Sequence, residues 1–155
     1  MNNSRRKPNT KGRRLRSVLL PRRVPRTLPL DLPPLRRVGL YPWLDAETNL
    51  IPRNRIQAYC DAIAQEFQPE RIVLFGSYGS GQPTPDSDVD LFVIMPFRGR
   101  PAQQAFRIRS RFDTPFPLDL LIRRPEDVVA RLREPDMFMV EVMTRGQVMY
   151  EAKHS

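Results

Sequence analysis

Short apolar runs alternate with helical patterns along residues 54–151 of this 155-residue chain. Apolar side chains recur at helical spacing over 54–67, and Pro69 ends that segment. Runs rich in β-branched and aromatic residues follow and have the length of strands: 71–75, 88–94 and 116–122. The face of the first helix includes Cys60, the single cysteine, which we expect to be a buried and inert thiol.

Helical segments are predicted between and after these strands. They comprise 102–112, a helix that begins at Pro125, and a helix over 135–146 whose methionines should fill the core. Arg107, Arg109 and Arg111 point in different directions around the first of these helices, so solvation is expected for them. Residues 148–150 suit a last edge strand. This order predicts an α/β fold in which helices flank a small mixed sheet.

Charge divides the chain unevenly and sets the expected domain boundaries. Residues 1–37 carry a net charge of +11, whereas residues 38–155 carry −2. The prolines of the basic segment are too frequent for a helix and too scattered for a strand, so we expect a disordered arm over 1–37, a linker over 38–52 and one domain over 53–151. The arm's longest apolar run, 18–20, is too short for a signal peptide or a membrane span, which predicts a soluble, cytoplasmic protein.

Three interpretations of the arm stay open. Its charge suits nonspecific binding of nucleic acid or another acidic surface. It could also dock a partner protein, or it could reflect a reading frame whose true start lies further along. Tyr41 and Trp43 lie in the linker and are placed to pin the arm to the domain, although simple packing explains them as well.

The strongest chemical signal follows the first predicted strand. Gly76 and Ser77 stand where that strand should end in a tight turn, and Asp-Val-Asp opens the second strand. The two-residue period of a strand puts Asp88 and Asp90 on one face, with Cβ atoms roughly 6 to 7 Å apart. Two carboxylates entering an apolar strand repel each other and lose hydration, so they are costly unless a metal ion neutralises them. Turn formation alone explains Asp86, which we leave out of the site.

A strand, a Gly-Ser pair, a loop of this length and an Asp-x-Asp that opens a second strand resemble the signature of the polymerase-beta-like nucleotidyltransferases, and specifically the minimal nucleotidyltransferase (MNT) family. The resemblance covers about residues 50–151. It implies a third acidic residue on a later strand, and Asp119 lies there between two leucines. Because neighbouring strands lie about 4.8 Å apart, Asp119 could complete a metal site with Asp88 and Asp90.

The resemblance also implies roles for these residues and a reaction. Gly76 and Ser77 match the family's triphosphate-anchoring pair. Asp88 and Asp90 match its metal ligands, and Asp119 matches its third carboxylate, so all three carboxylates are expected to be catalytic and to bind metal. The implied cofactor is Mg²⁺ in a two-ion site, with Mn²⁺ as a substitute, and the implied co-substrate is ATP. The expected reaction is transfer of NMP to a hydroxyl acceptor with release of pyrophosphate.

One departure from the family pattern concerns the residues after the Gly-Ser pair. Many members carry a small residue, a basic residue and glycine where this chain has Gly79, Ser80 and Gly81. A basic phosphate contact is therefore expected to be missing from this position. The absence of this contact is expected to reduce turnover more than nucleotide binding.

The sequence does not identify the molecule that accepts the transferred NMP. Small MNT proteins resemble antitoxins that neutralise helical HEPN-type ribonuclease toxins by adding AMP to a toxin tyrosine. A noncatalytic module that masks a partner by contact alone is a second hypothesis, and a nucleic-acid-binding protein that acts through residues 1–37 is a third. The carboxylates favour the enzyme over the noncatalytic module.

Overall fold

The computed structural model describes residues 44–114 and 116–154, so the predicted arm over 1–37, together with Tyr41 and Trp43, lies outside the described residues. The elements in chain order are α1 (Arg53–Phe67), β1 (Arg71–Phe75), α2 (Gly76–Ser80), β2 (Val89–Ile94), α3 (Pro101–Arg111), β3 (Leu118–Arg123), α4 (Pro125–Leu132), α5 (Met137–Arg145) and β4 (Gln147–Glu151). This order matches the sequence prediction except for α2, which occupies the place of the predicted turn.

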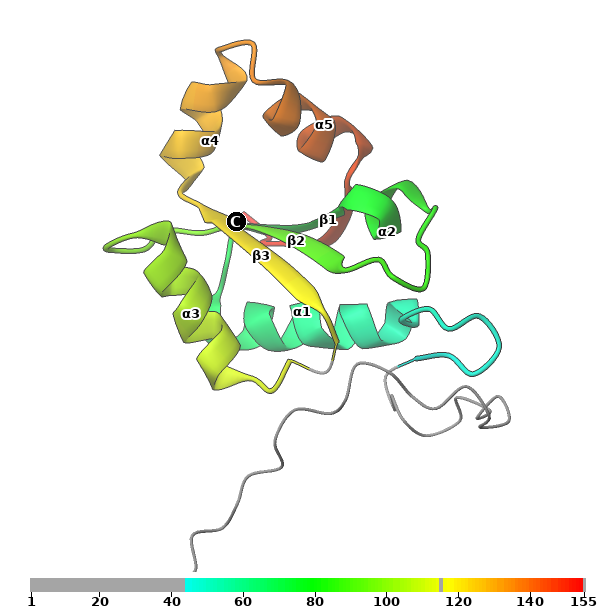
Figure 1. Ribbon diagram of the computed structural model, residues 1–155. Helices are drawn as coiled ribbons and strands as arrows, with labels where there is room; N and C mark the ends of the chain where they lie inside the picture. Colours follow the sequence, from blue (N-terminus) through cyan, green and yellow to red (C-terminus); the bar gives the residue numbers. More distant parts are fainter. Residues whose placement is uncertain (1–43, 115, 155) are drawn as a thin grey trace, which may run out of the picture. The chain divides into compact units, whose positions relative to one another are not determined.

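The strands form one four-stranded sheet in the order β3-β2-β1-β4. The pairs β1–β2 and β1–β4 are antiparallel, whereas β2 and β3 are parallel because α3 carries the chain back along the sheet (Figure 1). The predicted fold class, a small mixed sheet with flanking helices, is therefore confirmed. The predicted last strand also forms and pairs with β1 at one edge.

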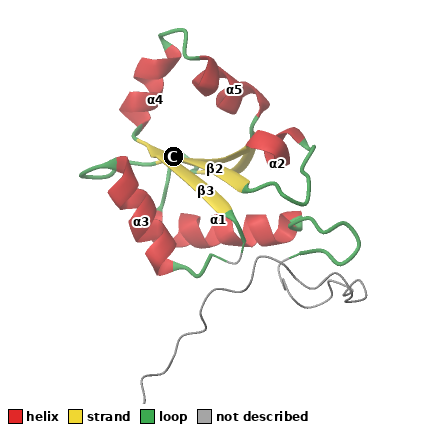
Figure 2. Cartoon of the chain, viewed as in Figure 1, coloured by secondary structure: helices red, strands yellow, loops and turns green. Residues whose placement is uncertain are grey.

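Helices cover both faces of the sheet (Figure 2). On one face, α1 and α3 bury apolar side chains such as Ile63 and Ile108 against the sheet. On the other face, α4 and α5 enclose a smaller core around Phe92, with Val128 and Val142. Because side chains alternate along a strand, each strand contributes to both cores, and a shift of register by one residue would exchange them.

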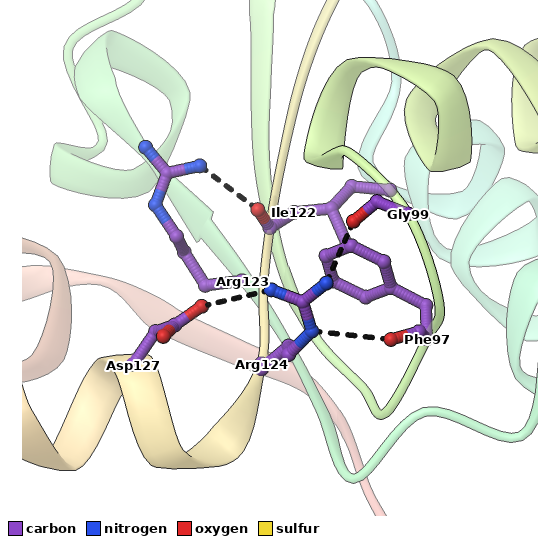
Figure 3. A network of polar contacts seen from close by, with 6 residues as sticks. All are labelled: Phe97, Gly99, Ile122, Arg123, Arg124 and Asp127. Atoms are coloured by element: carbon purple, nitrogen blue, oxygen red, sulfur yellow. Dashed lines mark hydrogen bonds and ion pairs between the residues drawn. The ribbon is translucent and has the colours of Figure 1, made fainter.

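Arg124 joins the turn after β3 to the loop after β2 (Figure 3). Its guanidinium donates to the carbonyl oxygens of Phe97 at 3.1 Å and Gly99 at 2.6 Å, and it lies over the Phe97 ring at 4.4 Å from the centroid. Asp127, in the first turn of α4, lies 3.6 Å from the same guanidinium. These contacts fix the start of α4 relative to the parallel strands.

Two expectations about side chains hold only in part. Arg109 is exposed, as expected of a solvated side chain, but it also donates to the carbonyl oxygen of Leu118 at 2.7 Å and so anchors the first residue of β3. Arg111 pairs with Glu66 on α1. The methionines do not all fill the core, since Met137 is 77% exposed at the start of α5.

Two further observations bear on the chemistry that is available. Cys60 is fully buried on α1, and burial raises the pKa of its thiol to about 12, which agrees with the expected inert thiol. Within residues 44–114 and 116–154, none of the helices has both the length and the apolar character needed to span a bilayer.

Candidate functional site

The segment after β1 begins the candidate site, and it is a short helix instead of the predicted turn. Gly76 has φ +64°, a left-handed conformation that lets the chain leave β1 and enter α2 at once. Tyr78 is buried beneath α2, and its hydroxyl oxygen accepts a hydrogen bond from the Ile51 N–H at 3.0 Å. Packing thus holds a five-residue helix that its glycines alone would not favour.

Gly76 lies directly against the carboxylate of Asp90. The last residue of β1, Phe75, pairs with Asp90 of β2, so the chain turns into α2 beside that carboxylate. A Cβ added at Gly76 would overlap with Oδ2 of Asp90. Glycine is therefore required here by conformation and by space, and its absent side chain leaves the Asp90 carboxylate beside the backbone of α2.

The parallel pair of strands brings two predicted carboxylates together. Asp90 of β2 is the register partner of Asp119 of β3, at the ends where both strands begin. Asp90 shares the sheet face of Phe92, which α4 and α5 cover. Asp88 precedes β2 in the structure and is not part of that strand, so its side chain is set by the loop and not by the predicted strand period.

Electrostatics at this end of the sheet disfavour charge on Asp90. Burial raises the pKa of Asp90 above its usual range, and the Asp119 carboxylate and then the Asp88 carboxylate raise it further. Asp88 and Asp119 are exposed, whereas Asp90 is half-buried. The apo protein therefore holds a carboxylate cluster whose repulsion a bound cation would offset.

The side chains, in their present positions, do not form a complete set of metal ligands. In the part of the chain that the structure describes, His, Cys, Asp and Glu side chains form no group of three or more that could hold a metal ion as they stand. Assignment of Asp88, Asp90 and Asp119 as metal ligands therefore stays a prediction. Their donor type fits Mg²⁺, because carboxylate oxygens are the hard ligands that this ion prefers.

A pocket of about 290 Å³ opens beside Gly76. Its walls come from the end of β1, from α2 and from α5, and they include Phe75, Gly76, Ser80, Phe138, Val142 and Arg145. The rings of the two phenylalanines meet edge to face, with centroids 5.7 Å apart. Sequence reasoning missed this pocket because α5 lies far from α2 along the chain, and no local pattern links the two helices.

Comparison with protein families gives one match. The family model described as "Polymerase beta, Nucleotidyltransferase" matches residues 57–155, which include every predicted site residue. A search of curated protein sequences finds no significant match.

Comparison with solved structures gives matches of low sequence identity. A candidate nucleotidyltransferase from Sulfolobus solfataricus is 12% identical, with a TM-score of 0.45 over 63% of this chain and 78% of that chain. A toxin-antitoxin structure with AMP-PNP is 21% identical, with a TM-score of 0.41 over 63% of this chain and 74% of that chain. A mutant of the toxin-antitoxin pair MntA-HpeT is 19% identical, with a TM-score of 0.40 over the same shares.

The contact between Gly76 and Asp90 generates the first prediction. Replacement Gly76→Ala should destabilise the protein by about 1–2 kcal/mol through its positive φ, and it should also displace the Asp90 carboxylate and weaken ATP binding. Gly81→Ala is the matched control, because Gly81 has φ +76° with nothing within 4 Å of an added Cβ. Denaturant melts and calorimetric titration with ATP and Mg²⁺ measure the two effects. Equal ATP affinities for the two variants would show that the Gly76–Asp90 contact has no part in binding.

Proposed function

Because this chain belongs to the polymerase-beta nucleotidyltransferase family, we propose that it transfers AMP from ATP to a hydroxyl group of a protein acceptor and releases pyrophosphate. The observation that carries the proposal is the register of β2 and β3, which pairs Asp119 with Asp90, the residue that lies against Gly76. Transfer of a nucleotidyl group requires carboxylates that can hold a metal ion and an accessible backbone that can bind the phosphates. The paired carboxylates and the glycine beside them are suited to these two tasks.

Gly76 and Ser77 are proposed to bind the phosphate chain. Gly76 is exposed and has no side chain to keep a phosphate away from the backbone. The Ser77 carbonyl oxygen accepts hydrogen bonds from the Ser80 hydroxyl at 3.1 Å and from the Gln82 N–H at 2.9 Å, which fixes the peptide of this residue. The Ser77 hydroxyl can then donate to a phosphate oxygen from a backbone that is already ordered.

Asp88, Asp90 and Asp119 are proposed to hold Mg²⁺, for which Mn²⁺ could substitute. Asp88 and Asp119 are exposed, so they can turn toward Asp90 at little cost in packing. Bound Mg²⁺ would neutralise charge on the carboxylates and the triphosphate. The half-buried Asp90 would gain most, because burial and two like charges act against its ionised form.

Asp119 is proposed to face the acceptor. It lies on β3, one of the two edge strands of the sheet, and its side chain is exposed. Its carboxylate can accept a hydrogen bond from the attacking hydroxyl and take the proton as the hydroxyl oxygen bonds to the α-phosphorus. The bond from that phosphorus to the bridging oxygen breaks, and pyrophosphate leaves with the electron pair.

The proposed acceptor is a tyrosine of a small helical toxin of HEPN type. Support for this choice comes from the sequence signature, which resembles that of MNT antitoxins. The protein would then neutralise its partner by covalent modification instead of contact alone.

A mixture of this protein, ATP, Mg²⁺ and a co-encoded helical partner tests the proposal. The partner should gain about 329 Da for each transfer, which is the mass of an added AMP group. Intact-mass spectrometry measures the gain, and replacement of the modified tyrosine by phenylalanine should abolish it because the attacking hydroxyl is gone. A stable complex whose two masses stay unchanged would instead favour a noncatalytic binding module.

Replacement of each carboxylate by an amide should impair a different step, either ATP binding or turnover. Asp90→Asn should reduce Mg²⁺-dependent ATP binding and transfer together, while the apo protein keeps or gains stability because burial and repulsion no longer oppose a charge. Asp119→Asn should keep much of the ATP affinity and lose turnover, because its role lies in the transition state. Calorimetry with and without Mg²⁺, together with a transfer assay, separates these outcomes.

Asp86→Asn is the matched control for the carboxylate variants. Asp86 is exposed in the same connection between α2 and β2, and it lies outside the proposed site. Its replacement should leave both binding and transfer near the wild-type values. If the Asp90 and Asp119 variants behave like this control, the carboxylates are structural and the enzymatic proposal fails.

A further inference from the structure

We propose that Arg145 on α5 contacts the phosphate chain of the bound nucleotide and supplies the cationic group that α2 lacks. This inference rests on the proposed function, since it assigns a further ligand-binding residue to the same site. The observation behind it is that Arg145 and Gly76 line one pocket, although nearly seventy positions separate them in the chain.

The pocket extends from Gly76, the residue against Asp90, to α5. Gly76 forms part of its wall and also touches the Asp90 carboxylate, so a phosphate chain beside Gly76 would extend into this space. Arg145 lies in the last turn of α5 and is the one basic side chain among the described residues that line the pocket. Among the described residues at that wall, no other side chain could pair with phosphate as a cation.

The charge of Arg145 is available to a ligand. Of the ion pairs among the described residues, none involves Arg145. Glu141, one turn earlier on α5, is acidic and also lines the pocket, but it would compete only weakly from its exposed position. A guanidinium presents several N–H donors in a plane and so suits the oxygens of a phosphate chain.

The backbone holds Arg145 in place beside α2. A Cβ at Gly146 would overlap with the Val142 carbonyl oxygen and with the Val73 side chain, so glycine lets the end of α5 pack tightly on β1. The next residue, Gln147, donates to the Gly79 carbonyl oxygen of α2 at 2.8 Å. Both walls of the pocket are therefore tied to the start of β4, and the position of the Arg145 backbone relative to α2 is fixed.

Arg145→Gln tests the inference directly. We expect its affinity for ATP to fall about tenfold to a hundredfold, because a charged hydrogen bond to phosphate is lost. Arg107→Gln is the matched control, since Arg107 is an exposed arginine on α3, on the other face of the sheet, and its affinity should equal that of wild type. Thermal melts of each variant verify that the fold is retained.

A second arm uses inorganic tripolyphosphate, which has no base or ribose. Competition with ATP should show that Arg145→Gln weakens tripolyphosphate binding by the same factor as ATP binding. If ATP binding weakens and tripolyphosphate binding does not, Arg145 contacts another part of the nucleotide and the inference is overturned.

A rescue variant makes the result independent of a simple loss of stability. Ser80 lines the same pocket from α2 and is exposed, so an arginine there could reach the same phosphate chain. The single variant Ser80→Arg measures the effect of losing the Ser80 hydroxyl, after which the Gln82 N–H still holds the Ser77 carbonyl oxygen. The double variant Ser80→Arg with Arg145→Gln should recover most of the lost affinity. Failure of the rescue, in a double variant that melts like wild type, would count against phosphate contact by Arg145.

The outcomes separate this inference from the proposed function. If wild type binds ATP with Mg²⁺ and Asp90→Asn weakens that binding while Arg145→Gln does not, the site stands and the role of Arg145 is overturned. If wild type binds neither ATP nor tripolyphosphate, the proposed function fails and the inference fails with it.

Discussion

The pairing of β2 with both of its neighbours is the constraint on which the site depends. β2 lies between β1 and β3, and its register places Asp90 opposite Phe75 on one side and opposite Asp119 on the other. A slip of one residue would turn Asp90 toward the core under α1 and α3 and would move Leu91 to the opposite face of the sheet. Apolar burial along β2 therefore fixes the position of a charged group that contributes nothing to the core itself.

That position has a cost for the apo protein. Asp90 is half-buried and lies near two other carboxylates, so its charge is disfavoured until a cation binds. Gly76 adds a left-handed residue at the same point. Energetic costs of this kind are commonly concentrated at functional sites, where the surrounding fold maintains them. Here the apolar cores on the two faces of the sheet provide that support.

The site and the fold could be predicted from the sequence to different extents. Strands β1 and β2 and helix α1 have clear apolar patterns, and the elements formed close to where those patterns indicated. The family resemblance stated from the Gly-Ser pair and the Asp-x-Asp is confirmed by the family match over residues 57–155. The roles of the individual carboxylates remain predictions, because side-chain rotation and ligand binding decide them.

The features that were missed depend on contacts between distant parts of the chain. Helix α2 has two glycines among five residues and forms because Tyr78 is buried beneath it, which no local propensity reveals. Asp136 caps α5 by accepting a hydrogen bond from the Met139 N–H at 3.1 Å, although Pro135 was the expected start. The pocket beside Gly76 needs α5 to pack on β1, and this packing follows from the tertiary fold alone.

A crystal structure with Mn²⁺ and a nonhydrolysable ATP analogue tests the central claim most directly, because anomalous scattering locates the metal without assumptions about the ligand. The account predicts a metal peak between the carboxylates of Asp88 and Asp90, with the phosphate chain beside Gly76. A nucleotide bound away from β2, or a metal that these carboxylates do not touch, would contradict it.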